Sequence, residues 1–448
     1  MERGTATKQI TEGVIWKQIL AFFFPILLGT FFQQMYNTVD TIIVGRFVST
    51  QALAAVGTTG PLVSILSGFF TGLGSGATVI LAQFYGAGDP KGVRDTLHTG
   101  ITLSLILGLL IMALGCGFGP VVLQWMRTPE DCLDMASLYV RIYFAGALAS
   151  MLYNMEAGIL RAMGDSRRPV ISLIVACLVN ILMDLVLVVG LKMGVAGAAL
   201  ATVLSQVVSA VMLLVVLLRE KEYPLELSGL GIQPKLLGRI LAIGVPAGLQ
   251  LMMFDLSNTL IQSGINSFGS TVMAAWTAYT KTDALTWMVS GAFGVAITTF
   301  VGQNYGAHRY DRVRQSVRVC LGMSIGTVGT ISLLMTVFRR VILGIYTTDT
   351  SVIETGAYII SVIVPFAAAF MPVEIFAGTM RGMGDSMRPT AIICLSVCVV
   401  RVLWIMTMVK KYHTLLMLCV CYPMTWVLCA VVFVVTYLRS FRTRLGAA

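Results

Sequence analysis

Charged residues are scarce in this sequence. Asp, Glu, Lys and Arg make up 12% of its 448 residues, whereas soluble domains carry roughly 25%. That share leaves too little polar surface to keep a particle of this size in water. Apolar residues instead come in long blocks such as residues 101–123. A helix needs about 20 apolar residues to cross a bilayer, and the sequence holds about twelve such blocks. It therefore predicts an all-α polytopic membrane protein with 12 transmembrane helices, for which the lipid bilayer is the first partner.

Signatures of catalysis and of metal binding are missing as well. No HExxH, GxSxG or clustered Asp-Asp motif lies in or beside an apolar block, and there is no P-loop. The sequence therefore predicts neither an enzyme nor an ATPase. Only three histidines occur, and the nine cysteines lack the spacing of a zinc site. We expect no cofactor beyond a coupling ion.

The net charge of +10 does not indicate nucleic-acid binding, because no basic domain is present to hold it. Lys and Arg gather near alternate ends of the apolar blocks, beginning with the N-terminus, as at residues 309–318. This positive-inside pattern predicts that both termini face the cytoplasm. The N-terminal residues also lack the small-residue cleavage site of a secretory signal peptide. We expect the first apolar block to remain in the mature protein.

An internal repeat organises the sequence. The run RAMGDSRRP at 161–169 recurs as RGMGDSMRP at 381–389, which is 220 positions later. QFYGA at 83–87 recurs as QNYGA at 303–307 with the same offset. Matches in one register indicate a duplicated pair of halves. Each half holds an even number of blocks, so both insert with the same orientation. We expect two six-helix bundles related by a pseudo-twofold axis along the membrane normal, with the substrate path at their interface.

The longest polar connection divides the sequence almost in half. It carries two prolines and two glycines between residues 220 and 235. We therefore predict an N-terminal six-helix lobe at 1–219, a cytoplasmic linker at 220–234 and a C-terminal six-helix lobe at 235–448.

Two acids lie within apolar blocks of the first lobe, where a charge costs at least ~2.5 kcal/mol. Asp40 lies six residues before Arg46 near the end of its block. Asp184 lies eight residues before Lys192, so the rise of a helix places the two acids at similar depth. No Lys or Arg lies deep in this lobe to pair with them. Because burial penalises an unpaired carboxylate, the site is suited to take up H⁺ or to hold Na⁺. The alternative is a satisfied polar network that ties the two helices together.

Neutral oxygen donors flank both acids. Tyr36 lies one turn before Asp40, and Asn180 lies one turn before Asp184. Asp40, Asp184, Asn180 and Tyr36 therefore form the predicted cation-coupling set, and no other metal site is expected. Pro25 interrupts the backbone hydrogen bonds of the same helix and predicts either a hinge or a static kink. The residues assigned to a substrate cavity are Gln33, Asn37, Asn154, Asp255, Asn258, Gln262 and Glu374.

The second lobe differs because its deep charges have both signs. We interpret Lys281, Asp283 and Arg401 as structural charge pairs. Glu156, five residues before Arg161 near the cytoplasmic end, is either a gate or one half of a local pair. The glycines between 68 and 76 allow close helix approach or, less simply, a hinge.

The runs at 25–47 and 71–88, together with the paired RxMGDSxRP motifs, resemble the multidrug and toxic compound extrusion (MATE) family. The resemblance covers nearly the whole length. It implies export of organic cations and other amphipathic compounds, driven by an inward gradient of H⁺ or Na⁺. It also implies a functional acid and a bend on the first helix, as in bacterial members. Asp255 and Glu374 match acids of other branches by region alone.

We therefore expect a secondary-active exporter that works by alternating access, as a monomer in the bacterial inner membrane. Its substrates should be small amphipathic compounds, cationic or neutral, because the first lobe is acidic inside. The nearest alternative is a lipid-linked precursor flippase. Such a pyrophosphate substrate would need several cavity arginines, and only Arg401 and Lys281 lie deep.

Overall fold

The computed structural model describes residues 10–126 and 128–441. Those residues are almost entirely helical. Within them, eleven helical segments are long and apolar enough to cross a membrane, and a bent pair of helices supplies a twelfth. The predicted all-α polytopic fold is confirmed.

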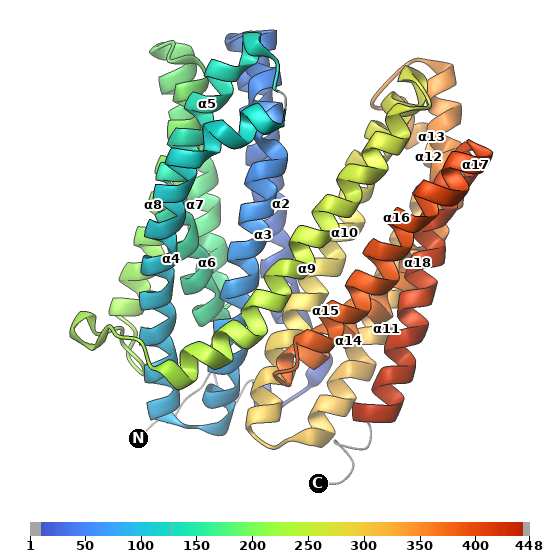
Figure 1. Cartoon of the computed structure of the whole chain (residues 1–448). Coiled ribbons are helices and arrows are strands. Elements are labelled where there is room, and N and C mark those ends of the chain that lie inside the picture. Colours follow the sequence, from blue (N-terminus) through green and yellow to red (C-terminus); the bar gives the residue numbers. More distant parts are fainter. Residues whose placement is uncertain (1–9, 127, 442–448) are drawn as a thin grey trace. The chain divides into compact units, whose positions relative to one another are not determined.

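Contacts divide the chain into two compact units (Figure 1). One contains Phe24–Gly248, and the other contains Ile10–Phe23 and the described residues from Leu249 onward. The division falls inside helices α2 (Ile15–Phe47) and α9 (Pro234–Asn266). Each of these two helices therefore begins in one unit and ends in the other.

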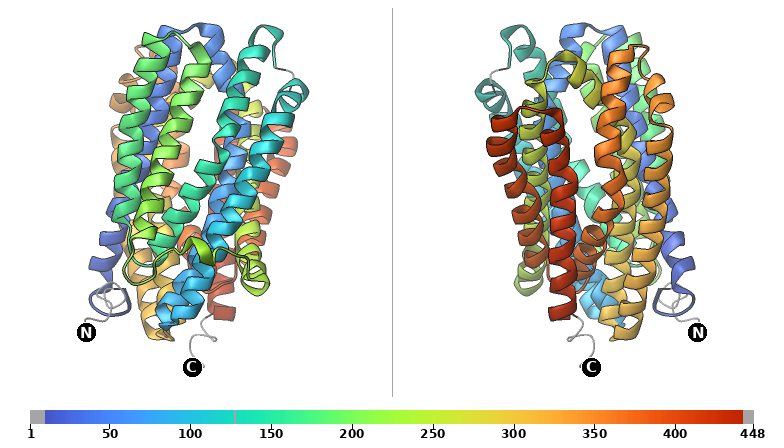
Figure 2. Two further views of the ribbon diagram at one scale, coloured as in Figure 1. Left: turned by 90° about the vertical axis from the view of Figure 1, so that its left-hand side faces the viewer. Right: turned by 90° about the vertical axis from the view of Figure 1, so that its right-hand side faces the viewer.

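The first unit is built from the later part of α2, six further α-helices and the start of α9. Helices α7 and α8 lie side by side (Figure 2, left). Helices α5 and α6 meet at a bend of 45° and are together long and apolar enough for one span. The elements between α2 and α9 are α3 (Thr50–Ala87), α4 (Pro90–Trp125), α5 (Glu130–Ala145), α6 (Ala147–Ala162), α7 (Arg167–Asp184), the π-helix η1 (Leu185–Gly190), α8 (Gly194–Leu218) and the 3₁₀ turn η2 (Leu227–Gly229).

The second unit is more interrupted. Pro365 opens a 3₁₀ segment in one span, since proline removes a backbone donor. Two π-helical segments interrupt another span. The elements after α9 are α10 (Ser270–Gly306), α11 (Tyr310–Val337), α12 (Arg339–Gly344), α13 (Thr350–Ile363), η3 (Val364–Phe370), α14 (Met371–Gly382), α15 (Met387–Ile393), η4 (Cys394–Val399), α16 (Val400–Trp404), η5 (Ile405–Val409), α17 (Lys410–Tyr412), α18 (Leu415–Thr436) and η6 (Tyr437–Phe441).

The repeated motif forms the same turn in both halves. Gly164 has φ 97° and Gly384 has φ 91°, a left-handed conformation that favours glycine. Asp165 then accepts a hydrogen bond from the backbone N–H of Arg167 at 2.9 Å and caps α7. Asp385 caps α15 in the corresponding way. The motif therefore starts a helix and has no catalytic geometry.

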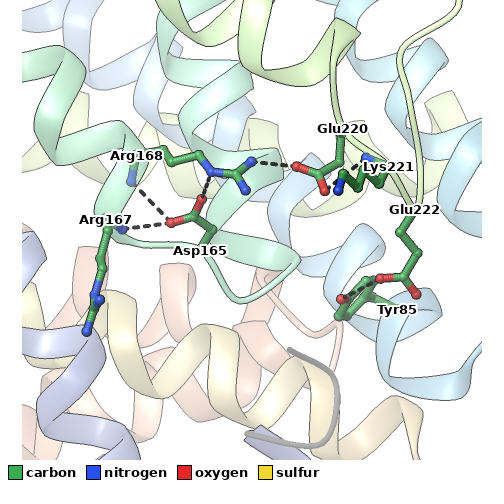
Figure 3. Close-up of polar contacts among 7 residues, drawn as sticks. All are labelled: Tyr85, Asp165, Arg167, Arg168, Glu220, Lys221 and Glu222. Atoms are coloured by element: carbon green, nitrogen blue, oxygen red, sulfur yellow. Dashed lines mark hydrogen bonds and ion pairs between the residues drawn. The ribbon is translucent and has the colours of Figure 1, made fainter. Parts of the chain in front are cut away.

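Side chains fasten the connection between α8 and α9 to the first unit (Figure 3). Arg168, at the start of α7, forms an ion pair with Glu220. Tyr85 of α3 donates a hydrogen bond of 3.4 Å to Glu222. Further along, His98 of α4 hydrogen-bonds the backbone of the connection. This segment is thus held along the surface of the first unit.

Glycines bring α3 and the start of α9 into close contact. A Cβ atom on Gly72 would lie 2.2 Å from the backbone nitrogen of Gly248. One on Gly76 would lie 2.3 Å from a backbone oxygen and 2.8 Å from the nitrogen of Gly244. Both helices therefore present a small-xxx-small face, the arrangement that lets membrane helices approach closely. The packing interpretation of these glycines is supported.

Candidate functional site

Helices α2 and α7 run side by side in the first unit. A Cβ atom on Gly29 of α2 would lie 3.3 Å from the side chain of Val170, near the start of α7. Towards the other end, Val44 of α2 shares one apolar cluster with Val188, which follows α7 in η1. Because the two contacts occur in the same order along both helices, α2 and α7 are parallel.

Asp40 and Asp184 lie between these contacts. Asp40 comes 11 residues after Gly29, and Asp184 comes 14 residues after Val170, so the acids are nearly level. Asp40 is 8% exposed and Asp184 is 0% exposed. Their carboxylates are close enough for the charges to interact. The structure therefore brings the two predicted acids together.

Polar atoms of this site lack partners among the described residues. Both carboxylate oxygens of Asp184 and one of Asp40 accept no hydrogen bond there. Asn180 lies one turn before Asp184 and is 1% exposed. Neither its amide oxygen nor its amide nitrogen makes a hydrogen bond within the described residues. Each buried unsatisfied group costs about 1–3 kcal/mol. Carboxylate and amide oxygens are suitable ligands for a proton or a small hard cation, so the donor set fits such a guest.

Tyrosines complete the site, and two of them were missed by sequence reasoning. Tyr139 of α5 is buried and lies close enough to Asp40 and Asp184 to interact with their charges. Tyr143 stacks on Tyr139 with ring centroids 6.3 Å apart. Tyr36, which was predicted, lies near Asp40 and Tyr143. The i, i+4 spacing of the two α5 tyrosines was the available signal, since it places both on one helix face.

The other predicted residues of the first unit are scattered around this cluster. Gln33 and Asn37 are exposed on α2, and Gln33 faces Tyr36. Asn154 donates a hydrogen bond of 2.8 Å to the backbone of its own helix. Pro25 lies inside α2, directly after the point where this helix passes from one unit to the other.

Glu156 is a further buried acid of the first unit. It is 0% exposed, and both of its carboxylate oxygens lack a partner among the described residues. The alternative of a local pair with Arg161 is therefore not formed.

In the second unit, the predicted cavity residues have ordinary local partners. Gln262 donates to Asn266 one turn further along α9 at 3.0 Å. Glu374 forms an ion pair of 3.7 Å with Arg381. Asp255 is partly buried and Asn258 is exposed on the same helix as Gln262.

The predicted charge pairs among Lys281, Asp283 and Arg401 are wrong. Asp283 accepts hydrogen bonds from the indole of Trp287 at 2.8 Å and the hydroxyl of Tyr279 at 3.2 Å. Lys281 is exposed. It does not pair with Asp283, because residues two apart on a helix do not share a face. No ion pair joins Arg401 to a carboxylate within the described part of the chain.

The repeat does not reproduce the acid pair. At the repeat offset of 220, Asp40 corresponds to Leu260 and Asp184 to Trp404. The matching helices of the second unit enclose an open groove of about 440 Å³ instead. Its lining is mostly apolar, with Lys410 at one end. The pair of buried carboxylates is therefore a property of the first unit.

A duplicated polytopic bundle with an unsatisfied acid pair buried in one of its units belongs to the class of membrane transporters. The sequence model of the MatE family matches residues 25–186 and again residues 246–407, once in each half. The chain therefore belongs to the MatE family of multidrug efflux transporters. The resemblance seen in its motifs is confirmed.

Relatives of known description cover most of the chain. The probable multidrug resistance protein YoeA of Bacillus subtilis is 29% identical over 394 residues, which are 86% of this chain and 85% of that protein. The FAD transporter of Shewanella oneidensis is 24% identical over 389 residues, with 86% and 85% covered.

Solved structures support the fold. An outward-facing multidrug resistance MATE family transporter of the MOP superfamily has a TM-score of 0.91 at 22% identity, covering 100% of this chain and 99% of the other. A MOP superfamily transporter from Pyrococcus furiosus has a TM-score of 0.91 at 21% identity, with 100% and 99% covered.

Proposed function

We propose that this protein is a secondary-active exporter in which H⁺ or Na⁺, bound at Asp40 and Asp184, drives the export of small amphipathic compounds. The observation that carries the proposal is the pair of buried carboxylates without a cationic partner. Burying two ions without compensation costs several kcal/mol each, which a bound cation offsets. A site of this kind is stable only when it is loaded, and this suits a coupling site.

Loading would bias the shape of helix α2. The acid pair lies in the later part of this helix, and Pro25 lies where α2 changes from one unit to the other. A proline lacks the backbone donor that would resist bending. Neutralising Asp40 would therefore shift the balance between two shapes of α2, and alternating access between two lobes would follow.

The chemistry of the first unit sets the expected substrates. Acids and hydroxyls line its interior site, and a further buried acid of this unit, Glu156, is also without a partner among the described residues. Cationic or neutral amphipathic compounds suit such a surface. Preferred transport of multiply anionic, phosphate-bearing compounds would contradict this assignment and favour a lipid-linked precursor flippase.

We also propose a multi-pass location in the bacterial inner membrane, with the monomer as the working unit. Both termini and the 220–234 connection would face the cytoplasm, between lobes at 1–219 and 235–448. The support is the distribution of Lys and Arg along the chain.

The test is efflux of a fluorescent dye from liposomes that contain the purified protein, under a pH gradient and then a Na⁺ gradient. Asp40→Asn keeps the shape and removes the charge, so it should abolish driven efflux, and Asp184→Asn should weaken it. Asp134→Asn, on exposed α5 surface, is the matched control and should retain activity. Tyr139→Phe removes one hydroxyl oxygen and should impair Na⁺-driven efflux more than H⁺-driven efflux. Full activity in Asp40→Asn would refute the proposal.

A further inference from the structure

Arg401 is a buried cation without a counter-ion. Its side chain lies on α16 in the second unit and is 1% exposed. The guanidinium Nε donates a hydrogen bond of 3.1 Å to the hydroxyl of Thr425 on α18. Its Nη2 has no hydrogen-bond partner in the described part of the chain. A full charge in this position must be explained by something that balances it.

Aromatic rings surround the guanidinium. It lies 4.3 Å from the ring centroid of Tyr422 and 5.6 Å from that of Phe254. Helices α16 and α18, which carry Arg401 and Tyr422, lie side by side (Figure 2, right). Cation–π contacts are attractive, but they are weak beside the desolvation of a full charge. These neighbours orient the guanidinium without neutralising it.

No carboxylate of this unit pairs with Arg401 in the described part of the chain. Asp283 accepts its hydrogen bonds from Trp287 and Tyr279. Glu374 is paired with another arginine at 3.7 Å. No ion pair joins Arg401 to Asp255 in the residues that the structure describes. Among the described residues, the acids of this unit therefore leave the charge of Arg401 unbalanced.

We propose that Arg401 binds the carboxylate of an aromatic ligand, so that the second unit recognises zwitterionic or anionic aromatic amphiphiles. The planar guanidinium matches a carboxylate, and its Nη2 is available as a donor. The faces of Tyr422 and Phe254 would flank the aromatic part of the ligand. The inference rests on the proposed function in one respect, because the ligand is taken to be a transported compound.

Two further observations support a ligand at this place. The indole Nε1 of Trp426, one turn after Tyr422 on α18, is also buried and has no partner in the described residues. The two rings are 5.8 Å apart between centroids. In addition, α16 lies between the π-helical segments η4 and η5, and such segments are frequent at functional sites because they let a helix shift. Donors without partners thus coincide with a helix that is irregular on both sides.

Thermal unfolding separates a ligand-binding arginine from a structural one. Arg401→Met keeps an apolar stem and removes a charge that nothing balances, so it should raise the melting temperature of the ligand-free protein. Arg381→Met is the matched control in the same unit, because it leaves Glu374 unpaired and should lower the melting temperature. A lower melting temperature for Arg401→Met would overturn the inference.

Binding is measured with two probes that differ in one group. Rhodamine B carries a free aromatic carboxylate, and its ethyl ester does not. In Arg401→Met the dissociation constant for rhodamine B should rise at least about tenfold, while that for the ester stays unchanged. Arg401→Lys should recover part of the binding. Equal losses for both dyes, or no binding of the acid form by the unmodified protein, would refute the site.

The binding assay needs no gradient, so its outcome is independent of coupling. Asp40→Asn should bind rhodamine B as the unmodified protein does while failing to export it. A failure at Arg401 therefore leaves the coupling proposal standing, and a failure at Asp40 leaves the carboxylate site standing.

Discussion

The contact between α3 and the start of α9 makes one substitution especially informative. In Gly72→Ala the new Cβ would lie 2.2 Å from the backbone nitrogen of Gly248 and 2.3 Å from its Cα. These are backbone atoms, so no side-chain rotation relieves the clash. Restoring an ordinary contact of 3.4 Å requires the two helices to separate locally by about 1.2 Å.

The expected cost follows from two opposing effects. Adding a methyl group to a packed interface costs roughly 1–3 kcal/mol. Replacing glycine by alanine inside a helix gains up to about 1 kcal/mol. Gly326→Ala on α11 provides the matched control, because nothing lies within 4 Å of its Cβ position. Both variants gain the same helix propensity, so their difference isolates the overpacking cost of roughly 1–3 kcal/mol.

The assay is thermal unfolding of both variants in the same detergent, followed by intrinsic fluorescence or by the loss of monodisperse protein. Gly326→Ala should melt at or above the temperature of the unmodified protein, and Gly72→Ala should melt below it. Equal melting temperatures for the two variants would show that α3 and α9 do not pack through these glycines.

Three further predictions concern single side chains. Asp283→Asn should lower stability by about 1.5–3 kcal/mol because it weakens charge-assisted hydrogen bonds, whereas Lys281→Met should leave the melting temperature unchanged because this lysine has no ion pair in the described structure. Hydrogen bonds from Ser351 hold the pKa of Asp349 below its usual value of 3.8. The stability that the ionised Asp349 gives to α13 should therefore be present above pH 3.8 and lost as the pH falls further. In acid unfolding curves, the stabilities of Asp349→Ala and the unmodified protein should converge at low pH. In a cysteine-free background, Gly231→Cys should react with an impermeant maleimide only in inside-out vesicles, and prompt labelling of intact cells would reverse the predicted topology.

The predictable part of the site follows from helix geometry. Asp40 lies six residues before the basic residue that ends its block, and Asp184 lies eight residues before the basic residue that ends its own. The fixed rise per residue of a helix converts these spacings into depths in the membrane. The contacts of Gly29 and Val44 with the neighbouring helix place the acids together as that reasoning requires. Depth is therefore readable from a sequence when a span is regular.

The unpredicted part depends on directions that spacing does not fix. Tyr139 reaches the acids from α5, whose course depends on the bend of 45° before α6. The failed charge pairs have a related cause. Lys281 and Asp283 are close in sequence, but they lie on different faces of α10, and an indole and a phenol supply the donors that an ammonium group was expected to supply. The presence of acidic and basic residues in the same lobe therefore did not imply that they form ion pairs.

The division of α2 and α9 between the units amounts to a reciprocal domain swap. Ile10–Phe23 begins the first half of the sequence but belongs to the second unit, and the residues of α9 up to Gly248 make the opposite exchange. A fragment cut at the α8–α9 connection would lose the segment that covers Gly72 and Gly76 and would expose a bare glycine face. Because Ile10–Phe23 is synthesised early but belongs to the second unit, that unit can be completed only after the residues from Leu249 onward have been made, whereas the first unit is complete once Gly248 has been made.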